Sequence, residues 1–197
     1  MEKLNLIKPT KDFEKQILEI AQEFFDDGTV LNWTSWLKRY ADNYDWRLQN
    51  IKSNERKETV DAWHVIANQF ILIRELDNKV LWFINTRLEL NDALLEHWWH
   101  IWYSIRPSER KKHYATAQLF SILKLYKNIW VEKVLLTCNK SNIWSAKTIQ
   151  NCGGILENEI IDPTDWELIQ RYWINIDDGL KKWKNFFDNM WMNVKII

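Results

Sequence analysis

The alternation of apolar and polar residues in the first third of the chain predicts a strand, a helix and a long polar insert. Residues 3–8 alternate, which is typical of a strand with one buried face. After Pro9, apolar residues recur at helical spacing, and Thr10 is a candidate N-cap. The apolar face comprises Phe13, Ile17, Ile20, Ala21 and Phe24. Residues 26–59 are irregular except for a short helix around 44–51, and such an insert is where a substrate-facing lid is expected.

The rest of the chain has a sharper pattern of short apolar runs separated by turns. Two runs joined by Asp77-Asn78 predict a β-hairpin of buried strands. The later expected elements are a linker with one or two helical turns at 91–97, a strand at 100–106, a helix at 112–128, a strand at 131–139, a helix at 142–151 ended by Gly153-Gly154, and strands at 155–161 and 167–176. This order predicts a mixed α/β domain and excludes an alternating doubly wound one.

Composition narrows the class of protein. The chain of 197 residues fits one sizeable domain, and its 27 basic and 27 acidic residues leave no net charge. A sequence-independent nucleic-acid surface needs a basic excess, so no nucleic-acid partner is expected. No apolar run is long enough for a membrane span, and the first residues lack the apolar core of a signal peptide. Cys138 and Cys152 fit a reduced, cytoplasmic protein better than a disulfide scaffold.

The stretch WHIWYSIRPSERKKHYAT, residues 99–116, carries the candidate chemistry. It predicts a strand that ends at Arg106-Pro107, a basic loop and the first turn of a helix. Backbone N–H groups and the positive end of the helix dipole then point at one place, which is a common way to bind phosphate. Loops of this kind usually contain glycine, and this one has none.

The chain resembles the GCN5-related N-acetyltransferase (GNAT) family, and in particular a bacterial subgroup of predicted acetyltransferases. The strings that carry the resemblance are SIRPSER, KKHYATAQL, KVLLTCNKSNIWSAKTIQNCGGILENEI and ELIQRYWI. It covers residues 1–176, with the insert at 26–59 on the substrate side, and is strongest from residue 83 onward. The implied fold is a central, twisted, mostly antiparallel sheet flanked by helices. The tail at 177–197 lies outside the resemblance, and its aromatic spacing predicts an amphipathic helix that docks on the domain or forms a contact in a homodimer.

The resemblance implies that acetyl-CoA binds at residues 104–116 and at Asn142. The family's loop pattern, Arg/Gln-x-x-Gly-x-Gly/Ala, corresponds to Arg110, Lys111, Lys112, His113, Tyr114 and Ala115, followed by Thr116. Backbone N–H groups would hold the pyrophosphate there. The backbone around Ser104 and Ile105 would pair with the pantetheine arm and place an N–H near the thioester oxygen.

The resemblance assigns the proton transfers less completely. Glu89 lies where many members keep a carboxylate base that acts through water. The family tyrosine that often protonates the leaving thiolate would fall near Ile149, so this chain departs from the pattern. His97 and His100 flank a Trp-Trp pair but have no cysteine or carboxylate at ligand spacing, so no metal is expected.

Three functions remain open from the sequence. The first is transfer of the acetyl group of acetyl-CoA to a primary amine of a small molecule or peptide, by direct attack in a ternary complex. The second is a non-catalytic acyl-CoA-binding module of the same fold, which the departure at Ile149 favours. The third is a carbohydrate or surface binder that stacks ligands on its many aromatic faces.

Tryptophan and glycine contents are both abnormal. The chain has 14 Trp and 4 Gly, although glycine makes up about 7% of an average protein. The subgroup that shares the strings has glycine at the positions of many of these tryptophans: Trp82, Trp98, Trp99, Trp102, Trp130, Trp144 and Trp166. The spacing of Trp33 and Trp36 would also suit a Gly-x-x-Gly turn. We hypothesise that the gene uses UGA for glycine and that these codons were translated as Trp. Trp173 is a tryptophan that the subgroup also has. His113 stands at the first glycine of the family's loop pattern, and misreading of UGA codons does not explain a histidine.

Overall fold

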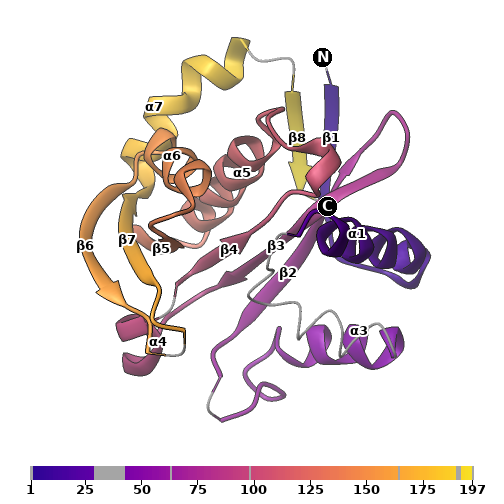
Figure 1. Cartoon of the computed structure of the whole chain (residues 1–197), viewed down its shortest axis with the longest axis horizontal. Coiled ribbons are helices and arrows are strands. Elements are labelled where there is room, and N and C mark those ends of the chain that lie inside the picture. The colour runs from indigo at the N-terminus through magenta and orange to yellow at the C-terminus, as the bar shows by residue number, and fades with distance from the viewer. Residues whose placement is uncertain are drawn as a thin grey trace.

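Two β-sheets form the frame of the molecule, which the computed structural model describes over residues 2–28, 43–62, 64–97, 99–163, 165–189 and 192–196 (Figure 1). The first sheet has five strands in the order β4-β3-β2-β1-β8. These are β1 (Glu2–Ile7), β2 (Ala67–Arg74), β3 (Lys79–Arg87), β4 (Ile101–Tyr103) and β8 (Met192–Ile196). The second has the order β5-β7-β6, with β5 (Lys133–Asn139), β6 (Ile155–Ile161) and β7 (Leu168–Asn175). All strand pairs described are antiparallel except β1 with β8, so the predicted mixed fold with a mostly antiparallel sheet is confirmed.

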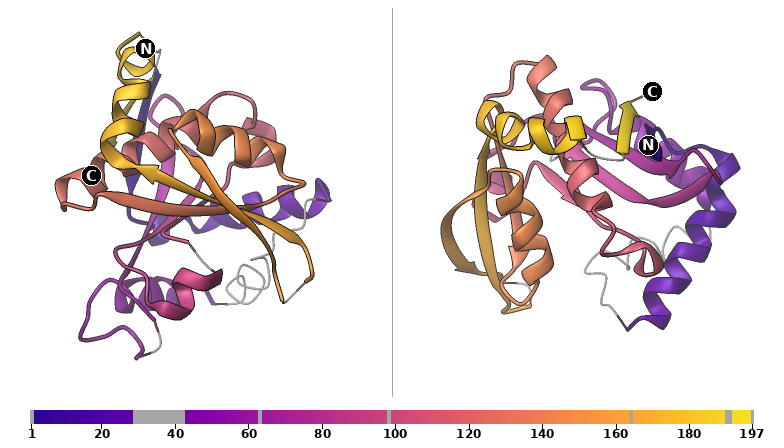
Figure 2. Two further views of the ribbon diagram at one scale, coloured as in Figure 1. Left: turned by 90° about the vertical axis from the view of Figure 1, so that its left-hand side faces the viewer. Right: turned by 90° about the horizontal axis from the view of Figure 1, so that it is seen from above.

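Helices cover the first sheet on both sides (Figures 1 and 2). On one side lie α1 (Glu14–Asp26) and α3 (Tyr44–Ser53), and on the other lies α5 (Tyr114–Asn128), between the two sheets. The apolar face predicted for the first helix is buried, with Ile17, Ile20 and Phe24 at most 1% exposed. The short helix α4 (Asp92–His97) precedes β4, and α6 (Ile143–Asn151) connects β5 to β6. None of the helices in the described part of the chain is both long and apolar enough to cross a membrane.

The C-terminal tail returns to the first sheet. The helix α7 (Ile176–Asn189) packs near α5, and β8 then pairs in parallel with β1. The strand was not expected, because a short apolar end carries little periodicity and its partner β1 lies at the other end of the sequence. Both parts of the tail, the helix and the strand, therefore pack against the domain of the same chain.

Two local details differ from the sequence predictions. Thr10 precedes a 3₁₀ turn (Lys11–Phe13) rather than α1, and its hydroxyl donates to Asp12 instead of capping the helix. The regular part of β4 spans only Ile101–Tyr103 because the backbone then turns toward Pro107 and a second 3₁₀ turn (Pro107–Glu109). The long insert is described only at its two ends, so its predicted role as a lid lies largely outside the described residues.

Three tryptophans occupy unusual positions. Trp130 and Trp166 have φ of 63° and 62° and are 89% and 80% exposed. Both residues thus have left-handed backbone, a conformation that favours glycine. Trp82 is fully buried against Phe24, and its indole N–H has no hydrogen-bond partner among the described residues. Trp33, Trp36 and Trp98 lie outside the described residues.

Candidate active site

The loop between β4 and α5 has the backbone of an anion-binding turn. Lys111 and His113 both have left-handed backbone, with φ of 64° and 63°, and His113 directly precedes α5. The N–H of Ala117 donates to the carbonyl of His113, so the N–H groups of the preceding helical residues have no partner four residues earlier in the helix. The N–H groups at the start of α5 are therefore available to an anion, and the left-handed positions next to them are occupied by lysine and histidine instead of glycine.

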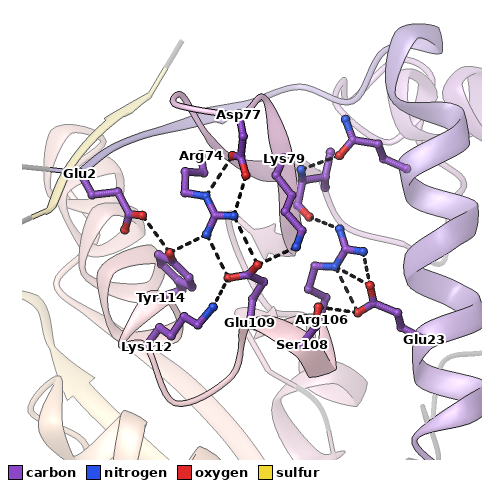
Figure 3. Close-up of polar contacts among 12 residues, drawn as sticks. Glu2, Glu23, Arg74, Asp77, Lys79, Arg106, Ser108, Glu109, Lys112 and Tyr114 are labelled. Atoms are coloured by element: carbon purple, nitrogen blue, oxygen red, sulfur yellow. Dashed lines mark hydrogen bonds and ion pairs between the residues drawn. The ribbon is translucent and has the colours of Figure 1, made fainter.

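A nearly buried carboxylate anchors this loop to the β2–β3 hairpin (Figure 3). Glu109, whose side chain is 4% exposed, contacts Arg74 at 3.0 Å, Lys79 at 2.7 Å and Lys112 at 2.7 Å. Burial opposes its ionisation, but hydrogen bonds from Arg74, Lys112 and Lys79 outweigh burial and lower the pKa of Glu109 to about 2. Arg74 also donates to Tyr114, the first residue of α5. The start of the helix is thus fixed relative to the sheet.

A second ion pair fixes the strand end to α1 (Figure 3). The guanidinium of Arg106 binds the carboxylate of Glu23 and donates to the carbonyl of Val80 at 3.0 Å. Ser108 donates to the same carboxylate at 2.9 Å. The hydrogen bond from Arg106 lowers the pKa of Glu23. Together, Glu23 and Glu109 hold both ends of the short 3₁₀ turn.

The basic side chains of the loop are used within the protein. Arg110 donates to Asp27 at 2.7 Å, and Lys112 binds Glu109. The ammonium of Lys111 lies 5.8 Å from the centre of the Trp144 ring on α6. This arrangement fits binding of a phosphate by the backbone of the loop, as the resemblance implied, better than binding by its side-chain charges.

Beside this loop, β4 and β5 separate. The two strands meet at His100, whose N–H donates to the carbonyl of Leu135 at 2.8 Å and whose Nδ1 accepts the N–H of Leu135 at 2.9 Å. Beyond that point the hydrogen-bonded neighbour of β4 is β3 alone, and β5 belongs to the other sheet. We call the region between the two strands beyond His100, toward Ser104 and Ile105, the gap, because hydrogen bonds join the strands at His100 and they belong to different sheets beyond it.

The backbone after β4 presents one N–H to this gap. The N–H groups of Ser104 and Arg106 donate to the carbonyls of Phe83 and Leu81, both on β3. Successive N–H groups of extended backbone point to opposite edges, so that of Ile105 points away from β3, toward the gap. Of the two residues predicted to contact the pantetheine arm, Ile105 is therefore the better placed donor.

The other wall of the gap is formed by β5 and the start of α6. Asn142 caps this helix, and its Oδ1 accepts the N–H of Ser145 at 3.1 Å. Its NH₂ group supplies further donors at the exposed helix end. Ile149 is fully buried, so the position at which the resemblance implies a tyrosine has no polar group. Asn142 and the loop thus lie on two sides of the same gap.

The remaining candidates lie elsewhere. Glu89 is exposed and follows the last residue of β3, Arg87, whose N–H donates to the carbonyl of His100. Glu89 therefore lies beyond the closed end of the gap, and the structure does not bring it beside Ile105. Burial, with a smaller effect of the Arg87 charge, lowers the pKa of His100 to about 4, so His100 is neutral. The side chain of His97 lies outside the described residues.

Comparison with known proteins places the fold. The sequence matches no family model and no curated protein. Among solved structures, it is similar to a spermidine N-acetyltransferase SpeG chimera from Vibrio cholerae and hSSAT, with a TM-score of 0.62 and 13% identity over 90% of this chain and 98% of that one. The microcin C7 self-immunity acetyltransferase MccE in complex with acetyl-CoA and AMP has a TM-score of 0.63 and 13% identity over 86% and 91%.

A third similar structure is RimL, a ribosomal L7/L12 alpha-N-protein acetyltransferase in complex with coenzyme A. Its TM-score is 0.62, with 11% identity over 87% of this chain and 93% of that one. The chain therefore has the fold of the GCN5-related N-acetyltransferases, as the resemblance predicted.

Proposed function

We propose that this protein is an acetyl-CoA-dependent N-acetyltransferase. The observation that carries the proposal is the gap between β4 and β5, which opens next to the left-handed loop at the start of α5. A strand edge and a helix N-terminus thereby face one elongated ligand, and acetyl-CoA has a thioester arm for the first and a pyrophosphate for the second. MccE and RimL, which share the fold, were solved with acetyl-CoA and coenzyme A respectively.

Each predicted cofactor contact has a role in this proposal. The backbone from Arg110 to Thr116 would hold the pyrophosphate, and Asn142 would bind the arm from the opposite wall. The N–H of Ile105 would donate to the thioester oxygen as negative charge develops there, and a donor of this kind contributes about 3 kcal/mol to catalysis in other enzymes. Ser104 would hold its neighbour in place through its own bond to β3.

The acceptor would attack the thioester directly while both substrates are bound. No covalent intermediate with the enzyme is needed, and holding the amine against the thioester supplies much of the rate. Glu89 remains our predicted base, and its position means that proton transfer must pass through water. Glu89→Gln should then lower kcat about 100-fold at neutral pH, and unchanged kcat would remove Glu89 from the mechanism.

The acceptor is proposed to be a primary amine of a small molecule or peptide. The neighbours named above include a spermidine N-acetyltransferase, a ribosomal-protein N-acetyltransferase and a microcin C7 self-immunity acetyltransferase. The same fold therefore serves acetyltransferases with different acceptors. We place the reaction in the cytoplasm because both cysteines are buried and free. A homodimer stays a prediction, which sedimentation of the purified chain would test.

The test measures cofactor binding and acetyl transfer separately. Acetyl-CoA binding is measured by calorimetry, and thiol release is followed with a panel of polyamines, amino sugars and peptide N-termini, with acetylated product identified by mass. Turnover of at least one amine supports the proposal.

The second candidate is a non-catalytic acyl-CoA-binding module, which the buried Ile149 favours. It predicts tight binding of acetyl-CoA with no thiol release on any amine. Absence of binding would contradict both candidates.

A further inference from the structure

The side chain of Tyr103 crosses the gap between the two walls. Tyr103 is the last residue of β4, and its hydroxyl lies 3.5 Å from the Oγ of Ser145. Ser145 belongs to the first turn of α6, which Asn142 caps. A phenol from the first sheet therefore reaches the helix that forms the opposite wall, at the end where the proposed cofactor contact lies.

The surroundings of this hydroxyl disfavour a thiolate. Besides burial, the charges of Cys152, which follows α6, and of Cys138 on β5 raise the pKa of the Tyr103 phenol. Burial raises the pKa of Cys138 to about 11 and that of Cys152 to about 12. A coenzyme A thiolate expelled into the same gap would be destabilised for the same reason, because the negative charge loses water without gaining a cation. The sulfur must therefore gain a proton as it leaves.

The helix α6 carries no tyrosine. Ile149 is an alkyl side chain, and Thr148 donates its hydroxyl to the carbonyl of Trp144 at 2.9 Å. The other described phenols have hydrogen-bond partners elsewhere: Tyr44 with Thr10, Tyr114 with Arg74 and Glu2, Tyr126 with Arg87 and His100, and Tyr172 with Gln170. Among the described residues, Tyr103 is the phenol that faces both walls.

We propose that Tyr103 is the general acid of the reaction and that Ser145 orients its hydroxyl. This inference rests on the proposed acetyltransferase function. The amine nitrogen forms a bond to the thioester carbon, the carbon–sulfur bond breaks with its electron pair on sulfur, and the phenol proton moves to that sulfur. The amine releases one proton to water, and the phenolate of Tyr103 regains one from water, so the products are the amide and the free thiol.

The acidity of the phenol is compatible with this role. Burial raises the pKa of Tyr103 above its ordinary value, so the phenol holds its proton at every pH of an assay. Burial also raises the proton affinity of a departing thiolate, which favours its protonation. A hydrogen bond to the developing thiolate also stabilises the transition state before the proton has moved.

The first test compares Tyr103→Phe with Tyr126→Phe, which removes a buried hydroxyl that donates to the carbonyls of Arg87 and His100 at the closed end of the gap. Tyr103→Phe should lower kcat about 100-fold and leave KM for acetyl-CoA within about twofold, because the lost proton transfer acts only in the transition state. Tyr126→Phe should lower the midpoint of thermal unfolding and leave kcat near the wild-type value. Equal kcat in wild type and in a folded Tyr103→Phe protein would overturn the assignment.

A second variant keeps the shape of the side chain. Incorporation of 3-fluorotyrosine at position 103 makes the phenol more acidic with almost no change in volume, so kcat should change while thermal stability stays the same. If Tyr103 had only a structural role, kcat would not change, and that result would overturn the assignment. Wild-type protein that binds acetyl-CoA but acetylates no amine would instead refute the proposed function, and the role of Tyr103 with it.

Discussion

The two walls of the gap are held together in different ways. The wall of β4 and the loop is tied by buried or half-buried ion pairs, centred on Glu109 and Glu23, that join it to the hairpin and to α1. The wall of β5 and α6 belongs to a sheet whose outer strand β6 is exposed along most of its length, and the first residues of α6 are more than 60% exposed. The loop before α5 is therefore rigidly placed, whereas ordering or moving the other wall requires less free energy.

The largest effect should come from breaking the rigid wall at its centre. Glu109→Gln leaves three cations without their shared carboxylate, and losing one partner of a buried network costs about 3 kcal/mol. Urea unfolding should show this loss, and calorimetry should show weaker acetyl-CoA binding. The matched control is Glu159→Gln, which removes the exposed pair with Lys140 on the other wall and should change neither measurement. Similar losses in both variants would contradict the difference between the walls.

The next effect concerns the closed end, where the walls meet. The folded-state pKa of His100 is about 4, below the ordinary value of 6.5, so the unfolded chain binds this proton more tightly. The stability contributed by neutral His100 is complete above about pH 6.5 and falls as the pH drops toward about 4. His100→Phe should lose about 2 kcal/mol at pH 7, because the N–H of Leu135 loses its acceptor.

Urea unfolding between pH 7 and pH 4 checks this prediction. The difference in stability between wild type and His100→Phe should shrink as the pH falls across that window. A constant difference would show that His100 does not titrate at the junction.

A smaller effect is expected from the left-handed tryptophans next to the exposed wall. Trp130 ends α5 and Trp166 lies in the turn before β7, and a bulky residue in this conformation costs about 1–2 kcal/mol. Trp130→Gly and Trp166→Gly should each raise the thermal midpoint by about 2–8 °C. Trp173→Gly is the control and should lower it, because Trp173 lies within β7 beside His100 and Lys133.

The DNA tests the reason for these tryptophans. Our hypothesis predicts TGA codons at Trp82, Trp130 and Trp144, and TGG at Trp173. TGG at all of these positions would end it and would restore the carbohydrate-binding hypothesis, which needs real aromatic faces at exposed sites.

The smallest change in stability, with a distinct change in binding, is expected at the loop itself. His113→Gly removes the strain of a left-handed residue and should stabilise the fold by about 1 kcal/mol. It should also tighten acetyl-CoA binding, because the imidazole no longer crowds the N–H groups of the loop. Lys111→Gly provides the matched comparison at the other left-handed position. Weaker binding by His113→Gly would show that phosphate does not bind at this loop.

Much of the fold was predictable because its elements are encoded locally. The apolar spacing of α1, the paired runs of β2 and β3 and the turn at Asp77-Asn78 each need only neighbouring residues. The strand–loop–helix stretch at 99–116 was also predictable from residue order, whereas the left-handed backbone at Lys111 and His113 was not, because the loop contains no glycine. The predicted Thr10 cap failed because a 3₁₀ turn intervened, which a cap pattern alone does not distinguish from a helix start.

The sequence by itself determined the order of the elements, the mixed α/β class and the position of the candidate loop. Only the tertiary structure decided which residues, distant in the sequence, contact the loop and the strand before it. Glu109 finds partners 35 and 30 residues away, His100 joins a strand 35 residues later, and Tyr103 reaches Ser145 at a separation of 42. It also paired β8 with β1 and placed Glu89 beyond the closed end of the gap. Periodicity reports which face of an element is buried, but the partner on that face depends on how the chain closes over long distances.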